Sequence, residues 1–140
     1  MPPEATAVLL LRREITSLRH RVHDWTPGRW SARADPAGVR GSAGTALGAQ
    51  PTRGDVAAAL VVRLAELGRQ AGTGASEGVR PPRLGDHALA DQLAVVGDDL
   101  LAAPGLPEVA AAALAAVVRA RTALDGTPAP ADTLAVTAEV

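Results

Sequence analysis

The feature that most constrains the fold of this chain is a set of apolar residues near its N-terminus, whose spacing alternates between three and four positions. The set consists of Val8, Leu11, Ile15, Leu18, Val22 and Trp25. Because an α-helix turns once in about 3.6 residues, this alternation places the whole set on one side of a helix from about Glu4 to Trp25. Such a heptad seam has to be covered, either by other helices of the same chain or by a second protein.

Three further segments carry the sequence signals of helix ends. A second helix is predicted over residues 52–67, because Thr52 and Asp55 approximate a capping box and a Gly follows the segment. A third helix is predicted to begin near Asp86, its expected N-cap, and to end before a Pro-Gly pair. A fourth is predicted over residues 107–125, with Pro in its first turn and Gly directly after its end.

These four helices predict an all-α protein, a small four-helix bundle formed by residues 1–126. The link between the third and fourth helices is short, so we expect those two to pack as an antiparallel hairpin. Residues 26–53 hold several Gly and Pro and are predicted to form a long irregular connection between the first two helices. Residues 127–140 are predicted to be a flexible tail.

Composition and charge indicate the compartment of the protein and the way in which its two halves contact each other. The sequence has no Cys, and no apolar run approaches the roughly 20 residues that span a bilayer, so we expect a cytoplasmic protein without a membrane segment. Residues 1–53 hold eight Arg and four acidic residues, whereas residues 54–140 hold six Arg and eleven acidic residues. This asymmetry favours docking of the two halves on each other or on a like partner.

The leading functional interpretation is a non-enzymatic interaction module that binds through its first helix. We expect a homo-oligomer or a helical protein partner. The sequence predicts no catalytic residue and no cofactor, because it contains neither a nucleophile elbow nor a phosphate-binding loop. The candidate interaction residues are Leu11, Ile15, Leu18, Val22, Trp25, Arg29 and Trp30.

Three charged positions on the later helices are unusual for their places. Asp98 and Asp99 lie near the end of the third helix, where carboxylates oppose the helix dipole, so we expect a compensating contact with an Arg of the basic half. Arg121 falls inside an apolar stripe of the fourth helix. It is expected to extend past the helix end into solvent, and the alternative is an ion pair with Asp86.

A metal site is the first alternative function. His20, His23 and His87 are the only imidazoles in the sequence, and a three-histidine site would need them to converge from two helices. His87 and Asp91 are four residues apart on the third helix, so a cation could bridge them. Surface histidines and a solvated acidic helix face explain the same residues, and this is the interpretation that we favour.

A nucleic-acid interface is the second alternative. Residues 12–40 combine several Arg with Trp25 and Trp30, and basic residues interleaved with aromatics can grip phosphates and stack bases. The sequence pI of about 6.3 and the lack of a helix-turn-helix or similar module make nucleic acid the less favoured partner.

The order of these features, two Trp after the first helix and three more helices behind, resembles DinB-like and maleylpyruvate-isomerase-type four-helix bundles over about residues 8–125. The resemblance implies a metal-dependent transferase that binds its metal through three histidines. Those families carry a His on the second helix and a spaced His pair on the third. Here the second helix has none and the third has only His87, so such a transferase stands as the enzyme-class alternative.

Overall fold

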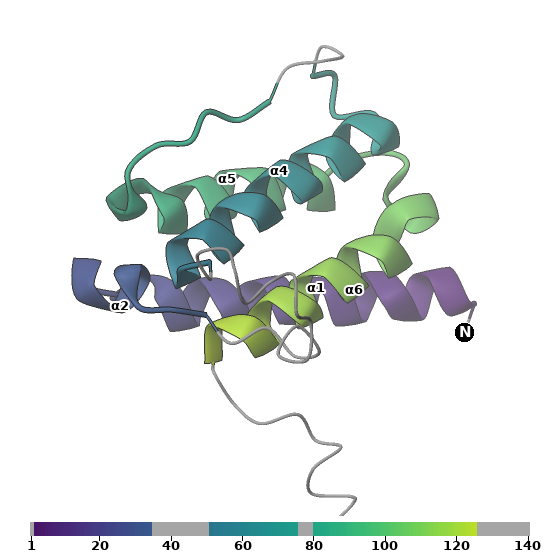
Figure 1. Cartoon of the computed structure of the whole chain (residues 1–140). Helices are drawn as coiled ribbons and strands as arrows, with labels where there is room; N and C mark the ends of the chain where they lie inside the picture. The colour runs from purple at the N-terminus through teal and green to yellow at the C-terminus, as the bar shows by residue number, and fades with distance from the viewer. Residues whose placement is uncertain (1, 35–50, 76–79, 126–140) are drawn as a thin grey trace, which may run out of the picture.

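The computed structural model of the chain describes residues 2–34, 51–75 and 80–125 (Figure 1). Within these residues, one lone antiparallel bridge between Arg33 and Thr52 is the only β-type pairing, and there is no strand. The predicted all-α bundle is therefore confirmed, while the predicted tail at 127–140 lies outside the described residues. The helices are α1 (Pro3–Val22), α2 (Pro27–Ser31), α4 (Arg53–Ala71), α5 (Leu89–Leu101) and α6 (Leu106–Asp125), with a 3-10 turn η1 (Asp86–Ala88) before α5.

The four long helices form a bundle in which α1 and α4 each pack against both α5 and α6. In Figure 1, α4 and α5 lie above α1 and α6. The helices α1 and α6 run in the same direction, since Glu14 pairs with Arg121 and Arg21 pairs with Asp125 further along both helices. The helices α4 and α5 run in the opposite direction to α1 and α6. The contacts of α4 with α6 and of α1 with α5 are therefore antiparallel.

The expectation that the last two helices pack as a hairpin is wrong. Although α5 and α6 are consecutive and run in opposite directions, they occupy opposite corners of the bundle and share almost no contacts in the described part. The cause lies at Gly105, whose backbone N–H donates to the carbonyl oxygen of Ala71 at 2.7 Å, at the end of α4. A Cβ at this position would lie 2.9 Å from the same oxygen. The close approach of Gly105 starts α6 beside α4 and away from α5.

The core is built where the α1 seam meets a stripe of small residues on α6. Leu11, Ile15, Leu18 and Val22 are each at most 3 % exposed. The buried stripe on α6 is also spaced by threes and fours, and its short side chains let the two helix backbones approach closely. Its members are Ala110, Ala113, Val117, Ala120 and Leu124.

Local signals fix most helix ends. The capping box that starts α4 is confirmed, because the Thr52 hydroxyl accepts from the Asp55 N–H and the Asp55 carboxylate accepts from the Thr52 N–H, each at 3.0 Å. The helix passes Gly68 and ends at Gly72, whose φ of 94° is the left-handed conformation that favours glycine at a C-cap. Asp86 is not the N-cap of α5, because its carboxylate pairs with Arg83 at 3.0 Å.

The predicted irregular connection contains a short helix. Thr26 caps α2 by accepting from the backbone N–H of Arg29, and Pro27 occupies its first position. After α2, the N–H of Ala34 donates to the Pro51 carbonyl at 2.9 Å, which joins the two ends of the segment 35–50. That segment lies outside the described residues.

Ion pairs join the basic and acidic halves, as the charge asymmetry predicts. Asp98 accepts from Arg19 at 2.7 Å, which confirms the expected contact between the end of α5 and an Arg of the basic half. The guanidinium of Arg121 lies 3.2 Å from the Glu14 carboxylate on α1, so both the predicted solvent path and the alternative pair with Asp86 are wrong. The helices of the described ranges are all too short or too polar to cross a membrane.

Candidate interaction site

The seam that the sequence offers to a partner is occupied by the chain's own helices. Leu11, Ile15, Leu18 and Val22 face inward against α5 and α6 and belong to the main core cluster, with Val8 and Trp25 packed against it. These residues were expected to contact a partner, which requires exposed side chains. In this fold the side chains are covered, so they are not free to contact a second protein. A binding surface has to lie on the outside of the bundle.

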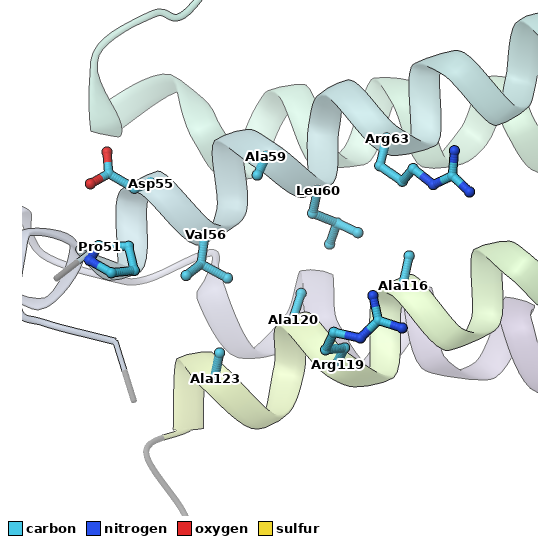
Figure 2. A pocket seen from close by; sticks show the side chains of 10 residues that line it. All are labelled: Pro51, Asp55, Val56, Ala59, Leu60, Arg63, Ala116, Arg119, Ala120 and Ala123. Carbon is cyan, nitrogen blue, oxygen red and sulfur yellow. The ribbon is translucent and has the colours of Figure 1, made fainter. Parts of the chain in front are cut away.

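A groove lies on the outside of the bundle, between α4 and α6 (Figure 2). It has a volume of about 380 Å³, and its lining is mainly apolar. Four of the ten lining residues are Ala, three of them on α6. The lining comprises Val56, Ala59, Leu60 and Arg63 of α4, Ala116, Arg119, Ala120 and Ala123 of α6, and Pro51 and Asp55 at one end.

The charges of the groove are uneven along its length. Figure 2 shows the guanidiniums of Arg63 and Arg119 extending from opposite walls, both remote from the end that holds Pro51 and Asp55. Arg63 has only a loose ion pair with Glu66 at 3.8 Å, and both arginines are exposed. At that separation the Glu66 carboxylate leaves most of the hydrogen-bonding capacity of the guanidinium unused.

Asp55 does not cancel these positive charges. Its pKa is lowered below the usual value, first because its carboxylate accepts the backbone N–H of Thr52, and further because of the nearby Arg83 guanidinium at 3.6 Å. The carboxylate is thus ionised but committed to the start of α4. The arginine end of the groove therefore presents two guanidiniums beside an apolar floor, and Arg63 is opposed only by its loose pair with Glu66.

The Trp residues of the predicted nucleic-acid surface have a structural role. Trp30 of α2 is only 2 % exposed and meets Trp25 edge to face, with ring centroids 4.7 Å apart. The guanidiniums of Arg29 and Arg53 lie 5.0 Å and 5.7 Å from the centre of the Trp25 ring. Arg29 and the two Trp are therefore brought together, but as a cation–π and aromatic cluster that closes one end of the bundle rather than as open stacking platforms.

The candidate metal ligands do not converge. His20 and His23 stack on α1 with ring centroids 5.8 Å apart, and His23 lies 3.0 Å from the Asp24 carboxylate. His87 is in η1 and forms no ion pair with Asp91 within the described residues. Across residues 2–34, 51–75 and 80–125, no group of three or more His, Asp or Glu is arranged to hold a metal ion.

No protein-family model, no curated protein and no solved structure matches this chain. The interpretation of its surface therefore depends on its own geometry.

The groove was missed at the sequence level, although one signal for it is present. The second predicted helix is apolar over most of its circumference, because Val61, Val62 and the alanines at 57–59 flank a main face made by Val56, Leu60, Leu64 and Leu67. That pattern predicts a helix covered on all sides at the bundle centre. In the structure the side of α4 that carries Val56 and Ala59 is not fully covered, and it becomes one wall of the groove.

Proposed function

We propose that this protein is a helical protein-interaction module, and that its α4–α6 groove receives one helix of a protein partner. The observation that carries the proposal is the combination of a mainly apolar floor with Arg63 and Arg119 on opposite walls. Helix-in-groove recognition uses an apolar surface for affinity and charges at the border for orientation. Here the border charges are guanidiniums, which bind carboxylates in a planar, two-pronged geometry.

The chemistry of the groove favours a helix over a small molecule. Pockets for small ligands place several convergent polar groups around an apolar cavity, and these fix the ligand's orientation. In the groove the polar side chains are two exposed arginines and an Asp that is already engaged in its capping box. An open trough between two antiparallel helices, lined by alanines, fits the ridge of a third helix instead.

The size of the groove sets the expected strength of binding. Ten residues line it, whereas a standard protein interface uses roughly 20–30 residues on each side. We therefore expect a transient contact, with a Kd on the order of 10–100 μM.

The proposal is tested with a fluorescein-labelled synthetic helix that carries Leu and Ala on one face and Glu on its flanks. We expect its fluorescence anisotropy to rise with concentration of the full chain, and the affinity to fall when salt is raised. The double variant Ala59→Glu/Arg119→Glu should weaken binding at least tenfold, because it adds two carboxylates to the groove and removes one guanidinium.

The matched control is Ala111→Glu/Arg13→Glu, which makes the same chemical changes at exposed positions outside the groove. It should bind the peptide within twofold of the unmodified chain. Equal loss of binding in both double variants, or peptide binding by neither variant nor the unmodified chain, contradicts the proposed function.

A further inference from the structure

The outer face of α5 has the features of a ligand for this groove. Four of its residues are spaced by four, three and four positions, so they form a ridge along one side of the helix, which we call the α5 strip. All four are exposed. The α5 strip consists of Asp91, Val95, Asp98 and Ala102.

Val95 is the apolar centre of the α5 strip. It is 59 % exposed, the most exposed of the large apolar side chains in the described residues. Asp91 precedes it by four residues, and Asp98 follows it by three, with Asp99 alongside. The α5 strip combines an exposed Val with carboxylates, and the arginine end of the groove combines an apolar lining with two guanidiniums, so these surfaces are complementary in both charge and hydropathy.

The carboxylates at the end of α5 are incompletely compensated. The last turn of α5 contains Asp98 and Asp99 and no basic residue, although the partial negative charge at a helix C-terminus disfavours carboxylates. Arg19 pairs with Asp98, yet the Asp98 side chain remains 63 % exposed. The Asp99 carboxylate has no ion pair in the described part of the chain, so it can accept a guanidinium from outside.

We propose that the occupant of the α4–α6 groove is the α5 strip of a second copy of this chain. The inference rests on the proposed function, since it names the partner for the same groove. One copy cannot fill its own groove, because its α5 is fixed at the corner of the bundle opposite α6. Each copy thus carries one groove and one strip on different faces.

Where each pair of copies makes a single contact between the two different surfaces, the assembly is head-to-tail. Such a contact leaves an unused groove at one end and an unused strip at the other, so further copies add until a ring closes or the concentration limits growth. Because the α5 strip presents four residues to ten lining residues, the contact is weak and the assembly grows with concentration.

The test uses two variants of the full chain, each of which loses one surface. Ala59→Glu/Arg119→Glu alters only the groove, and Val95→Glu alters only the α5 strip. At up to about 1 mM, light scattering and sedimentation should show an average mass above that of a dimer for the unmodified chain. Each variant alone should remain a monomer, with an unchanged far-ultraviolet circular dichroism spectrum.

Mixing the variants separates a contact between the groove and the α5 strip from a contact between two like surfaces. The Val95→Glu chain keeps an intact groove and the double variant keeps an intact α5 strip, so an equimolar mixture should form a heterodimer and stop there. The control Leu9→Glu, which alters another exposed apolar residue, should associate like the unmodified chain.

Three outcomes overturn the inference. The first is a monomer at all concentrations while the groove still binds the synthetic acidic helix, which leaves the proposed function standing. The second is association that Leu9→Glu abolishes and Val95→Glu does not, which assigns the contact to α1. The third is association that requires residues 127–140, shown by its loss in a chain ending at residue 126.

Discussion

Three consecutive leucines on α1 offer a direct test of where the heptad seam lies. Leu11 is 0 % exposed, whereas Leu9, two residues earlier on the same helix, is 55 % exposed. Leu9→Ala and Leu11→Ala are chemically identical changes with the same effect on helix propensity. Any difference in the free energy of unfolding therefore reports the burial of Leu11 inside the bundle.

The expected magnitude follows from the surroundings of each side chain. Truncating a fully buried Leu to Ala costs about 2–5 kcal/mol, and the cost rises when the neighbours cannot move into the cavity. The facing stripe of α6 is mostly Ala, whose side chains are too short to fill the space. We therefore expect Leu11→Ala to cost about 3–4 kcal/mol, and Leu9→Ala to stay within about 0.5 kcal/mol.

The assay is urea denaturation at several protein concentrations. With a urea m-value of about 1.5–2 kcal/mol/M, the midpoint for Leu11→Ala should fall by about 2 M. The shift should be the same at every concentration, because the contact is within one chain. Equal small effects for both variants, or a loss that disappears on dilution, would refute the internal placement of the seam and restore the interface expected from the sequence.

Three further predictions concern stability. Thr52→Ala removes the hydroxyl that caps α4 and should lower the free energy of unfolding by about 1 kcal/mol, measured by the same denaturation. Because the folded state lowers the pKa of Asp55, its carboxylate stabilises the fold above the unfolded pKa of about 3.9, and this contribution is lost as pH falls through the lowered folded pKa. Asp55→Asn should therefore be less stable than the unmodified chain at pH 7, and the difference should shrink as pH falls through the lowered folded pKa, so a difference that does not change with pH would contradict the assignment. Gly97→Leu should cost about 1–3 kcal/mol, since even a Cβ there would lie 3.1 Å from the Ile15 side chain, and a double-mutant cycle with Ile15→Ala should recover part of the loss.

The helices were predictable because their signals are local. The spacing of the α1 seam, the capping box at Thr52, and the Pro and Gly around α6 each depend on neighbours within a few residues. Errors at the ends arose where two local signals competed. Gly68 resembles a helix terminator, but the left-handed turn is made by Gly72, and α4 gains one more turn of packing.

The arrangement of the helices was less predictable, because it depends on contacts between distant segments. A short link suggests a hairpin, yet the hydrogen bond from Gly105 to Ala71 redirects α6 across the end of α4. The same arrangement brings Arg121 to Glu14 on α1 instead of to Asp86. The acidic partner of Arg121 is not identifiable from sequence spacing, because several acidic residues are equally plausible partners.

The candidate site was the least predictable part of the fold. A heptad seam indicates that a helix face must be covered, but it does not say by which chain. In this bundle the cover is internal, and the surface left open comes from residues of α4 and α6 whose pattern in the sequence does not distinguish an open face from a covered one. A groove is a property of two helices together, so its residues are recognisable only after the packing is known.

The backbone hydrogen bonds between Ala34 and Pro51 and between Ala32 and Arg53 hold residues 32–34 and 51–53 side by side. The chain therefore leaves and re-enters the bundle at one closed stem. Loop-closure entropy adds only about 0.6 kcal/mol when such a segment is doubled in length. We expect that a peptide tag, a fluorescent label or a small folded domain inserted between Ala34 and Pro51 leaves the helices in place. This stem is therefore a suitable insertion site for labelling the protein.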